Sequence, residues 1–311
     1  MAQLVSIVVP VFNEEASIGP FHATLESALG KIDADFEILF VDDGSTDSSY
    51  RILTELVRKD PRVRAIRFSR NFGSHAALTA GLHECRGDAA VMISVDLQDP
   101  PDLIAEFVRT WREGYDVVWG VRGTRDDPWS KALLARTFYG LIRKMAFANY
   151  PAEGMDFGLI DRKVINILNN LPEANRFVFA LIVWSGFRQT SIHYHRGARK
   201  LGVTKWPLGK RIKSALDVIV SFSYLPIRFV SYMGIFVSFA SFLYGAFLIV
   251  RRVFFGLGGA GWPSIMVAVL FLSGVQLIVL GVLGEYIWRT SDQVRGRPLY
   301  IVMEREESKE P

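Results

Sequence analysis

The sequence predicts an α/β domain followed by two membrane-spanning helices. Two observations support the α/β domain: in roughly the first 200 residues, apolar runs of strand length alternate with helical stretches, and clusters of polar residues follow the runs. A third observation predicts the spans. Beyond residue 228 there are two segments without any charged residue, and about 20 such residues cross the hydrocarbon core of a bilayer.

The composition agrees with this division. Half of the 311 residues are hydrophobic, and the mean hydropathy of +0.21 is high for a wholly soluble chain. A net charge of +4 suits anionic partners such as phosphorylated substrates or anionic lipid. The single cysteine, Cys85, excludes an intrachain disulfide and a cysteine-rich zinc site. The first residues lack the basic region of a signal peptide.

Five apolar runs are expected to form strands, and the first four are each followed by a helical stretch. The strands are Leu4–Val11, Phe36–Val41, Val63–Phe68, Ala89–Val95 and Val117–Val121, and the helices end near Leu29, Lys59, Glu84 and Glu113. This alternation implies a parallel sheet with right-handed crossovers. Ligands of such sheets bind at the carboxyl ends of the strands.

Polar clusters stand at those ends. They are Asn13-Glu14-Glu15, Asp42-Asp43, Ser69-Arg70-Asn71 and Asp96-Leu97-Gln98. The first strand is not followed by G-x-G-x-x-G, and no G-x-x-x-x-G-K-[ST] occurs, which disfavours a classical dinucleotide fold and a P-loop NTPase. Acids at strand ends, together with many arginines, suit a nucleotide diphosphate held through a divalent metal.

The stretch SVDLQDPPD carries the metal hypothesis. On an extended segment Asp96 and Gln98 would point to the same side, where their oxygens could complete a Mg²⁺ or Mn²⁺ shell. The alternative is that Asp96 is a turn residue. Asp99 and Asp102 surround Pro100-Pro101 and are expected to cap the next helix.

Two other strand-end clusters have both a structural and a ligand-binding interpretation. Asp42 and Asp43 could accept hydrogen bonds from a base or from ribose hydroxyls, because the following Ser-Thr-Asp can cap the next helix. Asn13 and Glu14 either cap the first helix or face the ligand. Asp156, in the Gly-flanked GMDFG, is a turn former or an active-site residue.

The apolar segments Phe229–Val250 and Trp262–Gly284 are separated by a short loop and predict a hairpin. The flanking basic residues place both chain ends on the cytoplasmic side. Residues 1–208 would form the cytoplasmic domain, 209–228 an interfacial amphipathic helix, 229–284 the hairpin, and 285–311 a juxtamembrane helix, a short strand and a tail. The basic stretch Tyr194–Trp206 is a surface loop or a site for a lipid headgroup.

Taken together, these motifs resemble the polyisoprenyl-phosphate glycosyltransferases of glycosyltransferase family 2, the dolichol-phosphate mannose synthase-like enzymes. The resemblance rests on VVPVFNEE, VDDGSTD, SRNFGSHAALTAGL, SVDLQDPP, GMDFGLIDR, RKLGVTKW, the hairpin and EYIWR…RGRPLYIV. Within that family it is closest to the bacterial undecaprenyl-phosphate glucosyltransferase branch. It implies a Rossmann-like GT-A nucleotide-sugar domain. The related D-x-D-x-Q pattern has Ser94 at its first position here, so this site has one carboxylate fewer.

The resemblance also implies roles for individual residues. By resemblance, the nucleotide is bound by Pro10, Asn13, Glu14 and Asp42, and the metal by Asp96 and Gln98. Asp156 corresponds to the active-site aspartate of the family. The residues near the phosphates are Arg122, Arg136, Arg199 and Lys205. From the residues alone, Arg122 and Arg136 belong either to a solvated face or to a phosphate clamp.

The function expected is inverting transfer of a sugar, UDP-linked, to polyprenyl phosphate at the bacterial inner membrane. A processive polysaccharide synthase is disfavoured because there is no Q-x-x-R-W motif and only two spans are predicted. A non-catalytic scaffold is a third possibility, and nucleic-acid binding is disfavoured because basic residues cluster near the spans. Self-association is expected, as a tetramer by resemblance, and Gly296–Met303 reads as an unpaired strand that would pair with another chain.

Overall fold

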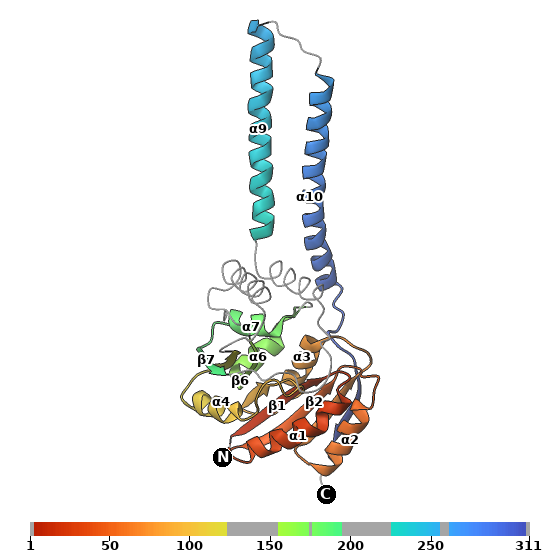
Figure 1. Ribbon diagram of the computed structural model, residues 1–311, viewed down its shortest axis with the longest axis vertical. Coiled ribbons are helices and arrows are strands. Elements are labelled where there is room, and N and C mark those ends of the chain that lie inside the picture. Colours follow the sequence, from red (N-terminus) through yellow and green to blue (C-terminus); the bar gives the residue numbers. More distant parts are fainter. Residues whose placement is uncertain (1–2, 123–154, 174–175, 195–224, 256–260, 309–311) are drawn as a thin grey trace. The chain divides into compact units, whose positions relative to one another are not determined.

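The computed structural model describes residues 3–122, 155–173, 176–194, 225–255 and 261–308 (Figure 1). The chain divides into two compact units. One comprises residues 1–218 together with 297–311, and the other comprises residues 219–296. The first contains the α/β sheet and the second contains the two apolar helices.

The sheet has eight strands in the order β7-β5-β6-β4-β1-β2-β3-β8. The bounds are β1 Leu4–Val11, β2 Asp35–Asp42, β3 Val63–Phe68, β4 Ala89–Met92, β5 Val117–Arg122, β6 Met155–Asp161, β7 Gln189–Tyr194 and β8 Val302–Glu307. Strands β4, β1, β2 and β3 run parallel, as does the pair β5 and β7. Strand β6 is antiparallel to β4 and β5, and β8 is antiparallel to β3.

Helices cover both faces of the sheet. They are α1 Glu15–Leu29, α2 Ser49–Lys59, α3 Ser74–Glu84, α4 Leu103–Arg112, α6 Arg162–Asn170 and α7 Val178–Trp184. On one face the alternate β1 residues Val5, Ile7 and Val9 share a core with Phe21 of α1. On the other face β2 and β3 pack with small residues of α3, including Ala77. Burial on both faces explains why these strands are nearly continuous apolar runs.

The five predicted strands and four predicted helices are confirmed, but the parallel sheet is confirmed only in part. Strand β4 ends at Met92 rather than Val95. Strand β6 lies between β4 and β5, so those two strands are not neighbours. The apolar runs predicted the strands themselves, whereas their order depends on long-range pairing that periodicity does not encode.

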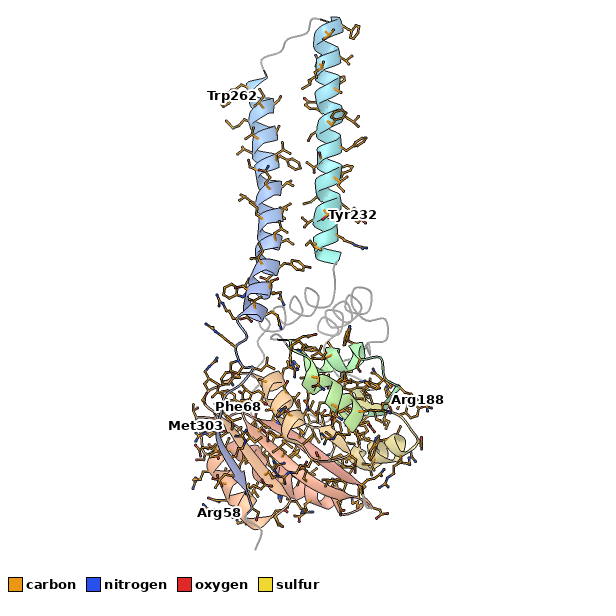
Figure 2. The ribbon with its side chains drawn as sticks, turned by 180° about the vertical axis from the view of Figure 1, so that it is seen from behind. Arg58, Phe68, Arg188, Tyr232, Trp262 and Met303 are labelled. Carbon is orange, nitrogen blue, oxygen red and sulfur yellow. The ribbon has the colours of Figure 1, made fainter. Side chains whose placement is uncertain are left out.

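The C-terminal strand differs from its prediction. It covers Val302–Glu307 instead of Gly296–Met303, and it pairs with β3 of its own chain (Figure 2). Tyr300 stacks on Phe68, with ring centroids 5.0 Å apart. The proposed reason for pairing with another chain is therefore wrong, because this strand already has a partner. Residues 304–307, expected in the tail, belong to the strand.

Two long helices, α9 Leu225–Phe255 and α10 Trp262–Val294, form the second unit. Both are long and apolar enough to cross a membrane, over Ile227–Arg251 and Ser264–Val294. Helix α10 has 33 residues and is about 50 Å long, so Glu285–Val294 continues it rather than forming a separate helix. Residues 225–228, predicted to be interfacial, already belong to α9; residues 209–224 lie outside the described part of the chain.

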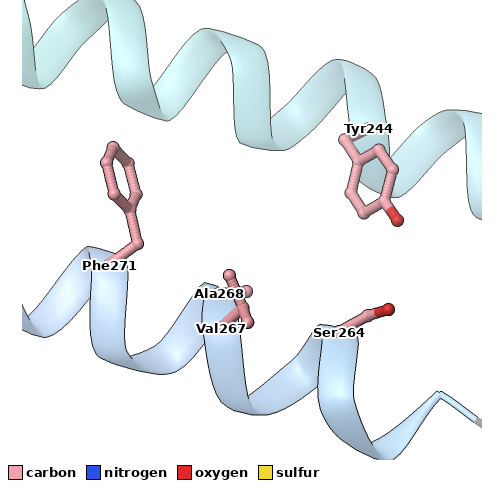
Figure 3. Close-up of a pocket in the computed structure, with 5 residues that line it drawn as sticks. All are labelled: Tyr244, Ser264, Val267, Ala268 and Phe271. Atoms are coloured by element: carbon pink, nitrogen blue, oxygen red, sulfur yellow. The ribbon is translucent and has the colours of Figure 1, made fainter.

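An open cavity of about 470 Å³ lies between α9 and α10 (Figure 3). Tyr244 and Phe271 line it from opposite helices, with Ser264, Val267 and Ala268. None of these lining residues is a lysine, arginine or histidine, so they offer no cationic side chain for a phosphorylated substrate. The candidate site for chemistry is at the carboxyl edge of the sheet.

Candidate active site

Several predicted residues meet at one edge of the sheet. Strands β1, β2 and β4 are parallel neighbours, so the residues that follow them lie at the same edge. Strand β6 runs the other way and begins there, with Met155 opposite Val121 of β5. The structure thus brings the backbone of Asp156 to the edge where Asp42 and Asp96 lie. Arg122 ends β5 at the same edge.

Asn13 joins the loops that follow β1 and β2. Its backbone N–H donates to Ser45 Oγ at 2.9 Å, and its side-chain Oδ1 accepts from the Thr46 N–H at 2.8 Å. Its φ of 51° lies in the left-handed region, which asparagine tolerates better than most residues. Asn13 does not cap α1, because Glu14 stands at the N-cap position. The Glu14 carboxylate accepts from Ser17 Oγ at 2.8 Å.

Asp43 holds the loop after β3. Its two carboxylate oxygens accept from the N–H groups of Phe72 and Gly73, at 2.6 and 2.9 Å. Burial raises the pKa of Asp43 to about 6, and these two hydrogen bonds act in the opposite direction. Gly44, with φ of 69°, lets the chain pass so close to Arg70 that a Cβ would lie 2.5 Å from its backbone. Asp43 therefore has a structural role. The expectation from the sequence that Asp43 is available to a ligand is wrong, because both of its oxygens already accept backbone hydrogen bonds.

Asp42 is arranged differently from its neighbour. Its side chain is fully buried, and Oδ1 accepts from the Ser45 N–H at 3.2 Å. The other oxygen, Oδ2, has no hydrogen-bond partner among the described residues, and the nearest cation is Arg67 Nε at 3.5 Å. Burial raises the pKa of Asp42, while the Ser45 hydrogen bonds and the Arg67 charge lower it. A buried carboxylate oxygen without a hydrogen bond is a candidate acceptor for a ligand donor group.

Asp96 lies in a turn instead of the extended segment expected. Its Oδ1 accepts from the Gln98 N–H at 3.2 Å, which closes an Asx turn. Leu97 between them has φ of 55°, a conformation that costs a leucine about 1–2 kcal/mol. Strained residues of this kind cluster at functional sites, where the surrounding structure maintains them. Asp96 is thus a turn residue, as the alternative interpretation held. Asp96 and Gln98 do not lie on an extended segment, so the expectation that their side chains point to the same side of a strand is wrong.

The two aspartates expected to cap α4 do not cap it with their side chains. Helix α4 begins at Leu103, and Asp102 at the N-cap position makes no side-chain capping bond. Asp102 is instead paired with Lys31 at 3.0 Å on the surface. Asp99 is fully buried, and its Oδ1 accepts the hydroxyl of Tyr194 at the end of β7. Asp99 therefore connects the turn after β4 to β7, the strand at one end of the sheet.

The part of the chain that the structure describes contains no cluster of three His, Cys, Asp or Glu side chains able to hold a metal ion. Two residues at the carboxyl edge of the sheet, Asp96 and Gln98, carry oxygen atoms of the kind that divalent metals bind. The Asp96 carboxylate and the Gln98 amide offer hard oxygens, which Mg²⁺ and Mn²⁺ prefer. They would supply part of a coordination shell, and diphosphate oxygens and water would supply the rest.

The other predicted site residues divide into two groups. Pro10 is near the end of β1, beside the Asn13 loop. Arg136, Arg199 and Lys205 lie outside the described residues. Sequence reasoning missed Arg67 and Tyr194, the partners of Asp42 and Asp99. Arg67 was detectable only as a charged residue within an apolar strand run.

The α/β domain carries acids and amides at the carboxyl ends of its strands, where sheets of this kind bind ligands, and comparison with known proteins identifies the family. Residues 6–168 match the family Glycosyl transferase family 2. The chain is 44% identical to the glycosyltransferase YkcC of Bacillus subtilis, covering 96% of this chain and 92% of that protein. It is 41% identical to the SfII prophage-derived bactoprenol glucosyl transferase of Shigella flexneri, covering 96% and 97%.

A solved structure shares the fold. Glucosyl-3-phosphoglycerate synthase from Mycobacterium tuberculosis, in complex with uridine diphosphate, is 18% identical, with a TM-score of 0.50 over 71% of this chain and 79% of that one. The chain belongs to glycosyl transferase family 2 and is a glycosyltransferase. Within the family it falls in the branch of the bactoprenol glucosyl transferases, and it has the GT-A-like fold that the sequence predicted.

Proposed function

We propose that this glycosyltransferase moves a sugar from a UDP-sugar, with glucose as the first candidate, to polyprenyl phosphate. The observation that carries the proposal is the extent of the similarity to bactoprenol glucosyl transferases. It covers 96% of the chain and therefore includes both apolar helices as well as the sheet. A lipid acceptor explains why a nucleotide-sugar domain is joined to two helices long enough to cross a bilayer.

The reaction proposed is a single displacement. An oxygen of the acceptor phosphate attacks the anomeric carbon, and the bond from that carbon to the UDP oxygen breaks with inversion. The electron pair leaves on the diphosphate of UDP. The acceptor phosphate is already ionised near neutral pH, so positioning and stabilisation of the leaving group carry most of the catalysis. Asp156 would orient the acceptor or the sugar at the edge where β6 begins.

The donor side would use the joined loops after β1 and β2. Pro10, Asn13, Glu14 and Asp42 are the candidate nucleotide ligands, with Asp42 Oδ2 the acceptor for a base N–H or ribose hydroxyl. Asp42 is fully buried, so a donor reaches it only after the covering residues shift. A divalent metal bound by Asp96 and Gln98 would neutralise diphosphate charge. A structural neighbour of this fold is described as a complex with Mn²⁺ and UDP.

The acceptor side would use basic residues. Arg122 and Arg136 would contact phosphate oxygens, and Arg199 and Lys205 would bind the lipid phosphate just before the apolar hairpin. Lys205→Ala is then expected to raise the KM for polyprenyl phosphate about tenfold, with little change in donor binding. Loss of UDP binding in Lys205→Ala, measured by titration, would show that Lys205 serves the donor instead.

Both chain ends and the sheet domain would lie on the cytoplasmic side of a bacterial inner membrane, because basic residues flank the hairpin. Self-association, as a tetramer, would be mediated by surfaces other than the edge of β3, which β8 occupies. Native mass measurement in mild detergent tests this, and a fully active monomer would contradict it.

The transfer itself can be tested directly. Membranes containing the full chain are incubated with undecaprenyl phosphate and a panel of labelled UDP- and GDP-sugars. Label from a UDP-sugar is expected in extracted lipid, and Asp156→Asn is the inactive control. Label in a polymer would favour a processive synthase. A complete lack of transfer from every donor would favour a non-catalytic scaffold.

A further inference from the structure

Three charged residues form a row across the edge of the sheet. The backbone register places Asp42 of β2 opposite Arg67 of β3, and Arg67 opposite Glu304 of β8. Residues opposite one another on neighbouring strands have side chains close enough to interact. Glu304 belongs to the strand that follows the apolar hairpin in the chain. The row therefore links the C-terminal strand to a candidate donor-binding residue.

The side chains of the row are in contact. Arg67 Nη1 donates to Glu304 Oε1 at 3.2 Å, and Arg67 Nε lies 3.5 Å from Asp42 Oδ2. The guanidinium also lies over the Tyr50 ring, 4.7 Å from its centroid. Arg67 is thus held from two sides. It is near enough to Asp42 to stabilise its charge, but too far to occupy Oδ2 with a hydrogen bond.

The distance between Arg67 and Asp42 affects both the charge of the carboxylate and the availability of Oδ2 to a ligand. Burial raises the pKa of Asp42 above the ordinary value, while the Ser45 hydrogen bonds and then the Arg67 charge act to lower it. If Arg67 moved closer, a charge-assisted hydrogen bond would occupy the oxygen that a ligand needs. If Arg67 were absent, the buried carboxylate would be protonated more readily. Glu304 and Asp42 contact the same guanidinium, and the Glu304 contact is the shorter of the two.

We infer that Arg67 and Glu304 are positioning residues for the donor nucleotide: Glu304 holds Arg67 at a distance at which it makes no hydrogen bond to Asp42 Oδ2, so that this oxygen can accept a hydrogen bond from the ligand. The inference rests on the proposed function, because it assumes that Asp42 binds the nucleotide. It assigns part of the donor site to a strand that lies after both apolar helices in the sequence.

Glu307 provides a matched control on the same strand. It pairs with Arg86 at 2.6 Å and with Arg64 at 3.5 Å, and it lies opposite Arg64 rather than Arg67. Glu307→Gln therefore removes a carboxylate and its ion pairs from β8 without touching the row. An effect shared by Glu304→Gln and Glu307→Gln would reflect the attachment of β8, whereas an effect specific to Glu304→Gln would reflect the row.

The experiment titrates UDP into the purified full-length chain in detergent, with thermal midpoints measured alongside. Arg67→Gln is expected to raise the Kd of UDP about ten- to a hundredfold, by analogy with the loss seen when the partners that orient metal ligands are removed. Glu304→Gln should raise it about three- to tenfold, and Glu307→Gln by less than twofold. Arg67→Lys should recover part of the loss. Because Glu304 acts through Arg67, the double variant should bind no more weakly than Arg67→Gln alone.

The donor KM should rise with the Kd, and kcat should change little. Equal Kd values for Glu304→Gln and Glu307→Gln would overturn the inference, as would additive effects in the double variant. If the unmodified chain does not bind UDP at all, the proposed donor is wrong and this inference fails with it. If the unmodified chain binds UDP while Glu304→Gln binds equally well, only the inference fails.

Discussion

The loop after β2 and the turn after β4 lie at the same edge of the sheet, but different interactions hold them. In the β2 loop, Asp43 binds the backbone of the loop after β3, and Asn13 binds the loop from the side of β1. In the β4 turn, the Asp96 carboxylate closes on the backbone of Gln98, around a left-handed Leu97. Both aspartates follow a buried strand, but Asp43 connects its loop to another segment, whereas Asp96 is part of a strained turn.

The difference suggests a division of labour. A loop tied to its neighbours suits recognition of a nucleoside, because preorganised groups lose less entropy on binding. A turn that presents a carboxylate and an amide suits the diphosphate and its metal. Substitutions in the β2 loop should therefore change stability or donor affinity, and substitution of Asp96 should change turnover.

The largest effect is expected from Asp96→Asn. The substitution removes the one carboxylate charge of the proposed metal site, Asp96 and Gln98, where the related family pattern has a further acid at the position of Ser94. Loss of one well-placed electrostatic group costs about 10²–10³ in kcat in comparable sites, or about 3–4 kcal/mol. The thermal midpoint should change little. Turnover at saturating Mg²⁺ or Mn²⁺ measures the effect, and full activity would remove the metal role of this turn.

Asp43→Asn should instead affect stability, by about 1–3 kcal/mol. An amide cannot accept from both the Phe72 and Gly73 N–H groups as the carboxylate does. The pH dependence should change too. The pKa of Asp43 is about 6 in the folded chain, above its ordinary value of 3.8, so the folded state holds more protons between about pH 4 and 6. Its contribution to stability therefore falls as pH rises through that window, by at most about 1.4 kcal/mol per pH unit.

Thermal midpoints of the unmodified chain and Asp43→Asn, compared from pH 4 to 7, test this assignment. The variant should lack the part of the slope that Asp43 contributes. An unchanged slope, or an unchanged midpoint at pH 7, would mean that Asp43 is not the tie between the two loops.

Asp99 should behave as a tether and not as a helix cap. Asp99→Ala and Tyr194→Phe should each destabilise the fold by about 1–3 kcal/mol, because each leaves a buried polar partner without its hydrogen bond. The double variant should cost less than the sum of the two. Additive losses in denaturant unfolding would show that the two side chains are not coupled.

The smallest effect is expected at Asp102. Its side chain makes no capping bond, and its ion pair with Lys31 is exposed. Asp102→Ala should therefore change stability by less than about 1 kcal/mol, as exposed ion pairs usually do. Lys31→Ala should cost no more. A larger loss in Asp102→Ala alone would restore the capping interpretation.

The sequence predicted five of the eight strands, the gathering of polar residues at their carboxyl ends and the two apolar helices, because each of these follows from local patterns of apolar and polar residues. It did not predict the strands β6 and β7 or the pairing of β8 with β3, and the order of the strands depends on contacts between distant segments. The same limit applies within the site. Adjacent Asp42 and Asp43 look alike in the sequence, and their different partners in the fold separate them: Asp42 lies beside Arg67 of β3, whereas Asp43 binds the backbone of the loop after β3.

The division between the two loops is tested most directly by titrating UDP and uridine into the unmodified chain and Asp96→Asn, each with and without Mn²⁺. In the unmodified chain, Mn²⁺ should strengthen binding of UDP and leave uridine unchanged. Asp96→Asn should lose most of the Mn²⁺ effect on UDP while binding uridine normally, because the β2 loop is intact. An undiminished Mn²⁺ effect in Asp96→Asn, or a parallel loss of uridine binding, would contradict the separate roles assigned to the two loops.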